Sequence, residues 1–238
     1  MNEPTHTLQF GDAAIEYTLT YAPRKTLAIS VHPDCSVTVK APAGSDFAAV
    51  EAFLRKRAAW ILRKQAEFAV APPQPPPRRY VSGENFAHLG RQYRLSVTEG
   101  EREWVKLTRT HLEVITPNKA DTAYVRAQVD AWLRRQAQRY FYERVVVLLP
   151  RFHPLVLPEP ELGIRAMKSR WGSCTGKGKI TLNLHLMRVP QSCIDYVIVH
   201  ELCHLIELNH SKRFYTLLEK VMPDWQTRRE RLKQVEIA

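Results

Sequence analysis

The stretch "VIVHELCHLIELNH" (residues 197–210) decides how the sequence is interpreted, because it holds three histidines and a glutamate within fourteen positions. In an α-helix, residues four positions apart lie on one face, so His200 and His204 can both reach one cation. Glu201 directly follows His200, roughly 100° around the helix, and therefore lies beside the cation rather than binding it. The spacing predicts a helix with an HExxH motif, in which two imidazoles hold Zn²⁺ and the carboxylate activates metal-bound water.

A motif this short also arises by chance, with both histidines hydrogen-bonded in a core or exposed to water. His210 favours the metal site, because six residues after His204 leave room for the helix to end and the chain to return over the metal. Asn209 suits that turn, since asparagine tolerates left-handed φ angles. Three protein ligands plus water are typical of catalytic zinc sites. We therefore expect one Zn²⁺ held by His200, His204 and His210, at a site that also suits other divalent metals.

The rest of the chain has the composition of a globular protein, with 45% hydrophobic and 25% charged residues among 238. Its start, "MNEPTHTLQFGDAAIEY", lacks the basic and apolar regions of a signal peptide. Apolar runs such as "VVVLL" (residues 145–149) are far shorter than the ~20 residues that cross a bilayer. The four cysteines form no CxxC pair. We expect a cytoplasmic protein without disulfides and without a membrane partner.

Basic residues exceed acidic ones, 35 against 24, which gives a net charge of +11. They alternate with aromatic and aliphatic residues in three segments of helical character, "RKRAAWILRK", "RRQAQRYFYER" and "RRERLK". Such segments can contact phosphate groups, so nucleic acid and nucleotides are alternative partners. The pattern is more typical of a solvated helix face that covers a sheet.

The proline-rich segment "APPQPPPRR" (residues 71–79) divides the chain, because proline fixes φ and has no N–H to donate. On either side, "YTLTYAPRKTLAISVHPDCSVTVKAP" and "YRLSVTEGEREWVKLTRTHLEVITP" alternate apolar and polar residues and precede a helical pattern. We predict an α+β protein: a β-rich unit with a basic closing helix in residues 1–70, a semi-extended connector, and an α+β domain in residues 80–238. Ser192 is expected to cap the motif helix, with Asp195 as its reciprocal partner.

Five short segments in the carboxy-terminal half, in the order "SRWGSC", "ITLN", "DYVIVHELCHL", "NHSKRFY" and "MPDW", resemble one family. That family is the YgjP-like group of zinc metallopeptidases, related to the SprT-like and WLM proteins among the zincins. The resemblance is strong over about residues 80–232 and weaker before them. It implies a zincin-like domain of the minigluzincin type, with zinc ligands at His200, His204 and His210 and the general base at Glu201. In the metzincin motif HExxHxxGxxH a glycine stands at the position of Glu207, so the resemblance does not extend to true metzincins.

Three further residues are predicted to contact substrate or the transition state. Arg170, in the turn that contains "SRWGSC", and Tyr215, after the third histidine, are candidates for stabilising the oxyanion. A surface ion pair and a core aromatic are the respective structural alternatives. Asn183 lies on the predicted strand "KITLNLHL", which as an edge strand would receive an extended substrate.

Together these features predict a zinc-dependent hydrolase, with a metallopeptidase that cleaves a peptide or protein substrate as the leading hypothesis. An alternative on the same site is hydrolysis of a nucleotide phosphoanhydride, because metal-activated water also attacks phosphorus. This alternative ranks second because the sequence has no P-loop and lacks the carboxylate-rich ligands of two-metal phosphatases. A third hypothesis is a nucleic-acid-binding protein with a secondary metal site.

Overall fold

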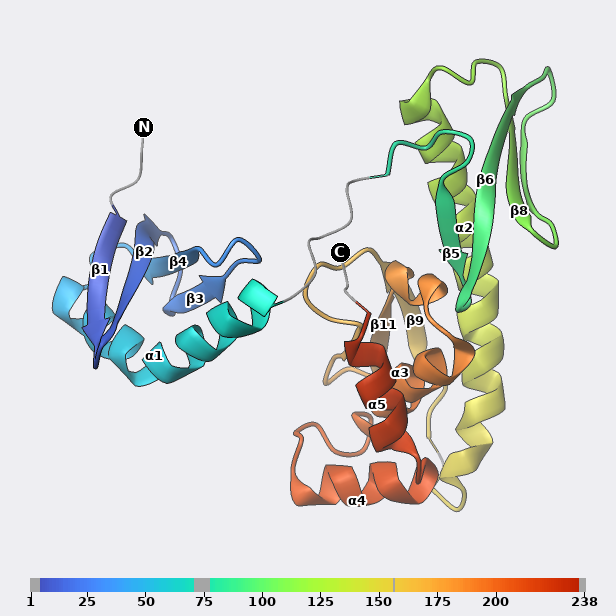
Figure 1. Cartoon of the computed structure of the whole chain (residues 1–238). Helices are drawn as coiled ribbons and strands as arrows, with labels where there is room; N and C mark the ends of the chain where they lie inside the picture. Colours follow the sequence, from blue (N-terminus) through green and yellow to red (C-terminus); the bar gives the residue numbers. More distant parts are fainter. Residues whose placement is uncertain (1–4, 71–77, 156, 236–238) are drawn as a thin grey trace. The chain divides into compact units, whose positions relative to one another are not determined.

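The computed structural model describes residues 5–70, 78–155 and 157–235, which contain five α-helices and three mixed β-sheets (Figure 1). The predicted α+β class is confirmed. The chain divides into two compact units, residues 1–76 and 77–238. Residues 71–77 of the proline-rich segment lie outside the described residues, so its role as a connector stays a prediction. None of the described helices is long and apolar enough to span a membrane.

The amino-terminal unit is a four-stranded sheet covered by one long helix. Its strands alternate buried and exposed residues, as in β2, where Ile15, Tyr17 and Leu19 point into a core shared with the buried face of α1. The strand order is β1-β2-β4-β3, with β2 and β4 parallel and the outer pairs antiparallel. The elements are β1 (Thr5–Phe10), β2 (Ala13–Ala22), β3 (Ala28–Val31), β4 (Val37–Pro42) and α1 (Phe47–Val70).

The first half of the second unit repeats this topology. Its strand order is β5-β6-β8-β7, again with a parallel central pair and antiparallel outer pairs. The long helix that follows begins at a cap, because the Asp121 side chain accepts a hydrogen bond from the Tyr124 N–H at 2.9 Å. The similar sequence patterns of the two halves thus correspond to one topology used twice. The elements are β5 (Asn85–His88), β6 (Arg91–Glu99), β7 (Trp104–Leu107), β8 (His111–Thr116) and α2 (Thr122–Leu148).

The second half of this unit adds a three-stranded sheet and three helices. The strand order is β10-β11-β9, in which β11 pairs antiparallel with β10 and parallel with β9. The elements are the 3-10 helix η1 (Leu149–Phe152), β9 (Glu161–Arg165), β10 (Gly172–Cys174), β11 (Lys179–Asn183), the 3-10 helix η2 (Leu184–Arg188), α3 (Gln191–Cys203), α4 (Lys212–Val221) and α5 (Trp225–Lys233).

Two local predictions in this half are wrong. The predicted strand "KITLNLHL" ends at Asn183, whose side chain caps η2 by accepting the His185 N–H at 3.1 Å. The predicted cap at Ser192 is also absent, because α3 begins directly after Pro190 and has no side-chain cap. Asp195, its expected partner, is engaged in an ion pair instead.

Helix α3 carries the HExxH motif and is almost entirely buried among α2, α4, α5 and the strands β10 and β11. The Arg144 guanidinium on α2 donates two hydrogen bonds to the Asp195 carboxylate on α3, at 2.8 and 3.0 Å. Arg228 on α5 lies 4.0 Å from the same carboxylate. Asp195 is only 6% exposed, so this network orients the motif helix against both neighbours.

Candidate metal centre

Three imidazole rings converge at the carboxy-terminal end of α3. The Nε2 atom of His210 lies 3.1 Å from Nε2 of His204 and 3.0 Å from Nε2 of His200. The potential ligand atoms of all three side chains lie within 4.8 Å of one another. Nitrogens bound tetrahedrally to zinc at about 2.05 Å would be about 3.3 Å apart, so the observed spacing fits one such ion. The arrangement brings together all three predicted ligands.

The local backbone explains how His210 returns to the helix. His200 lies in the last turn of α3, and His204 is the residue at its carboxy-terminal cap. A short loop then leads to Ser211, which caps α4 by accepting the Phe214 N–H at 3.4 Å. The predicted left-handed φ at Asn209 is not observed, because its carbonyl instead closes the turn by accepting the Ser211 N–H at 2.7 Å.

A backbone carbonyl determines the orientation of one ring. Nδ1 of His204 lies 3.0 Å from the carbonyl oxygen of Glu207, so Nδ1–H donates and the Nε2 lone pair is left facing the other histidines. The structure assigns the orienting contact to the Glu207 main chain.

Phe214, a residue that we did not predict, forms the floor of the cluster. Its ring centroid lies 4.9, 4.6 and 4.8 Å from those of His200, His204 and His210, and the side chain is fully buried. An apolar floor beneath three imidazoles restricts their rotation and excludes water from that side. The only sequence signal was the helical spacing of apolar residues in α4, which does not indicate contact with the histidines.

Glu201 is buried next to the histidines, with 5% of its surface exposed. Burial raises the pKa of its carboxyl group to about 7, and the positive charge of Arg170 acts in the opposite direction. Its Oε2 atom has no hydrogen-bond partner among the described residues. A buried carboxylate oxygen without a partner is costly in a purely structural role, which makes Glu201 a candidate for chemistry.

The strand β10 passes directly against this carboxylate. A Cβ atom placed on Gly172 would lie 2.6 Å from Oε1 of Glu201 and 2.8 Å from its Cγ. Real Cβ atoms do not approach other atoms so closely. The glycine of "SRWGSC" is therefore required for the close contact between β10 and Glu201.

The remaining predicted residues have different positions. The charge of Arg170 acts on Glu201, and Tyr215 stacks on His210 at 6.3 Å between ring centroids and on Trp225 at 5.5 Å. Asn183 is fully buried, which rules out the predicted substrate contact. Its amide instead donates to the main-chain carbonyl of Arg170 at 2.8 Å and so holds the loop before β10. The strand that carries Asn183 is the central strand of its three-stranded sheet, and β10 and β9 are the edge strands among the described residues.

Known proteins resemble this chain in sequence and in structure. Among solved structures, the metallopeptidase zymogen of Pyrococcus abyssi abylysin matches with 22% identity and a TM-score of 0.36, covering 40% of this chain and 92% of that one. The metallopeptidase zymogen of Methanocaldococcus jannaschii jannalysin matches with 21% identity and a TM-score of 0.35, covering 40% and 94%. No curated protein matches. The family model described as the YgjP-like metallopeptidase domain matches residues 25–235. This chain therefore belongs to the YgjP-like metallopeptidase family, which makes it a hydrolase and implies that it uses a metal.

Proposed function

We propose that the protein is a zinc metallopeptidase whose metal is held by His200, His204 and His210 and whose general base is Glu201. The observation that carries the proposal is the meeting of three Nε2 atoms, with separations of 3.0 and 3.1 Å, beside a buried carboxylate whose Oε2 has no partner among the described residues. Three neutral imidazoles suit Zn²⁺, and leave one position of a tetrahedral site for water or substrate.

Held by these three imidazoles, Zn²⁺ would supply Lewis acidity and would lower the pKa of bound water to about 7. The protein's own contribution begins with Glu201, which accepts a proton from the attacking water and later donates it to the leaving amine. Its burial excludes competing water, and its close contact with β10 holds the carboxylate in one position. The fixed tautomer of His204 and the Phe214 floor hold the imidazoles in place throughout.

We propose that the peptide substrate adds to the free edge of β10. The Trp171 carbonyl accepts the Asn183 N–H and the Thr175 N–H donates to the Lys179 carbonyl, both at 2.9 Å. Alternate residues of an antiparallel strand face opposite edges, so the N–H and C=O groups of Gly172 point away from β11. An extended peptide paired with them passes directly beside the general base. This edge replaces the strand that we predicted for that role.

Two side chains are available to stabilise negative charge on the carbonyl oxygen. Arg170 lies in the loop before β10, its charge acts on Glu201, and its main chain is held by Asn183. Tyr215 is 37% exposed and is held between His210 and Trp225 by ring stacking. We assign the oxyanion contact to Arg170, because a guanidinium brings a full positive charge to the developing oxyanion.

The family match favours a peptide substrate over the nucleotide and nucleic-acid alternatives. The test compares the wild-type protein with Glu201→Gln on a fluorogenic peptide library. We expect chelator-sensitive cleavage by the wild type, its loss in Glu201→Gln, and equal zinc content in both proteins. Undiminished cleavage by Glu201→Gln would refute the assignment of the general base. Zinc-dependent nucleotide hydrolysis without peptide cleavage would refute the peptidase.

A further inference from the structure

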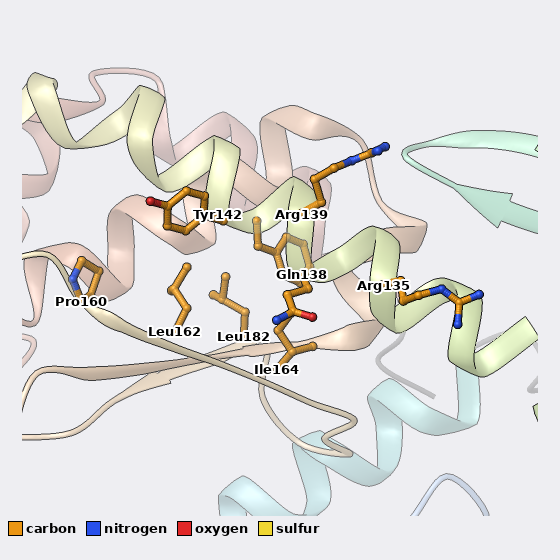
Figure 2. A pocket seen from close by; sticks show the side chains of 9 residues that line it. Arg135, Gln138, Arg139, Tyr142, Pro160, Leu162, Ile164 and Leu182 are labelled. Atoms are coloured by element: carbon orange, nitrogen blue, oxygen red, sulfur yellow. The ribbon is translucent and has the colours of Figure 1, made fainter.

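A second concave site lies between α2 and the strand β9, away from the histidines. Its volume is about 540 Å³, within the ~300–1,000 Å³ range of ligand pockets. Figure 2 shows Leu162 and Ile164 from β9 and Leu182 from β11 facing Tyr142 and Gln138 of α2. The centre of the cavity is therefore apolar, with one amide group on the helix side.

The register of the sheet shows that this cavity is separate from the metal centre. Leu182 on β11 pairs with Gly172 of β10 on one side and with Ile164 of β9 on the other. Gly172, Leu182 and Ile164 thus form a row across the three strands and face the same side of the sheet. Gly172, at one end of the row, lies against Glu201, and Ile164, at the other end, lines the cavity. Two strand spacings, about 10 Å, separate the backbones of Gly172 and Ile164.

The strand at this end of the row has an unpaired edge. Within the part of the chain that the structure describes, β9 pairs only with β11. An unpaired strand presents a row of N–H and C=O groups that another extended chain can pair with. The cavity adjoins this edge, so a peptide paired with β9 can place a side chain between Leu162 and Tyr142.

The rim of the cavity carries positive charge. Arg135 and Arg139 lie on the same face of α2 as Gln138 and Tyr142, at helical spacing, and none of the described residues that line the cavity is acidic. At its edge, the Tyr142 hydroxyl donates a hydrogen bond to Glu159 at 3.4 Å. Figure 2 shows both guanidinium groups directed away from the apolar centre. They can therefore contact residues that flank a side chain inserted into the cavity. The Arg139–Glu143 pair, at 3.8 Å with both side chains mostly exposed, is too weak to compete strongly for this arginine.

We infer that this groove binds an extended peptide segment in which one apolar side chain is flanked by acidic residues. The backbone of the segment pairs with β9, its apolar side chain occupies the cavity, and its carboxylates meet Arg135 and Arg139. Main-chain pairing supplies affinity and the pocket supplies specificity, as in other cases of strand addition. The inference does not depend on the peptidase activity, because the groove lies at the opposite edge of the sheet from Glu201.

The test measures fluorescence anisotropy of a labelled peptide, with a central leucine flanked on both sides by glutamates, against full-length protein with the Glu201→Gln change, which prevents cleavage. We expect saturable micromolar binding that Arg135→Glu weakens about tenfold. The matched control is Arg134→Glu, the same charge change on the neighbouring exposed residue of α2 that does not line the cavity, and it should weaken binding less than twofold. A peptide with lysines in place of the glutamates should bind at least tenfold more weakly.

Three outcomes would overturn the inference. Equal weakening by Arg134→Glu and Arg135→Glu would show a general charge effect rather than a site. Undiminished binding of a peptide N-methylated at alternate amides would exclude strand addition to β9. Absence of saturable binding at millimolar peptide would exclude the site. As a folding control, both charge variants should unfold at the same temperature as the wild type.

Discussion

Replacing Gly172 by alanine should impair catalysis without removing the metal. The added Cβ would lie 2.6 Å from Oε1 of Glu201, whereas ordinary contact begins at 3.4 Å, so the carboxylate must move by about 0.8 Å. A misplacement of about 1 Å in an active site costs roughly 100-fold in rate. We expect kcat for peptide cleavage to fall about 100-fold in Gly172→Ala, with the zinc content unchanged, since the three atoms nearest to the new methyl group all belong to Glu201.

The matched control is Gly176→Ala in the same turn region, where a Cβ meets nothing within 4 Å and the φ angle is ordinary. Its kcat should stay within twofold of the wild type. A double-mutant cycle separates the contact from general damage, because Glu201→Asp removes the atoms that overlap at Oε1 and Cδ and leaves only the overlap at Cγ. The loss caused by Glu201→Asp should therefore be smaller in the Gly172→Ala background than in the wild type. A wild-type kcat for Gly172→Ala, or strictly additive losses in the cycle, would refute the reasoning.

Four other perturbations follow from the structure. Asp195→Ala leaves the half-buried Arg144 without its carboxylate partner, and chemical denaturation should show a free energy of unfolding about 3–5 kcal/mol lower; a loss under 1 kcal/mol would contradict a stabilising role for this ion pair. Gly90→Ala adds a methyl group 2.8 Å from the Pro190 side chain, at the start of α3. It should lower the melting temperature more than Gly83→Ala, because Gly83 has a similar positive φ but open space around it. Equal shifts in melting temperature would show that backbone strain alone accounts for the effect. Burial lowers the pKa of His88 from 6.5 to about 4, so its contribution to stability, about 3 kcal/mol, is complete above pH 6.5 and is lost as the pH falls through about 4. In urea unfolding between pH 7 and 4, the free energy of unfolding of His88→Gln should therefore depend less on pH than that of the wild type. Parallel curves for the two proteins would contradict this. Removal of metal with a chelator should abolish peptide cleavage and zinc should restore it, whereas chelator-resistant cleavage would exclude the metal from the reaction.

Helical periodicity was sufficient to predict that His200 and His204 would lie side by side in the candidate metal centre. His200 and His204 lie one turn apart on a helix, so their convergence depends only on local geometry. His210 was predicted from the length of the intervening segment, and the loop does return it to the other two, although without the left-handed residue that we expected. The α+β class was likewise evident from two alternating segments, each followed by a helical pattern.

Contacts between distant segments were not predictable in this way. Phe214 beneath the imidazoles and Gly172 against Glu201 come from elements that approach only in the folded chain. The same limit explains the errors at Ser192 and Asn183. Pro190 starts α3 without a side-chain cap, and burial turns the Asn183 amide toward the main chain of the loop before β10. Local propensity could not anticipate either tertiary constraint.

The most direct test of the metal centre is the zinc affinity of the protein, measured by competition with a chromophoric chelator in the wild type and in single alanine variants of His200, His204 and His210. We predict one zinc per chain in the wild type, at least a 100-fold weaker affinity in each histidine variant, and wild-type affinity in Glu201→Gln. Wild-type zinc affinity in His210→Ala would contradict the three-histidine site on which the proposed function depends.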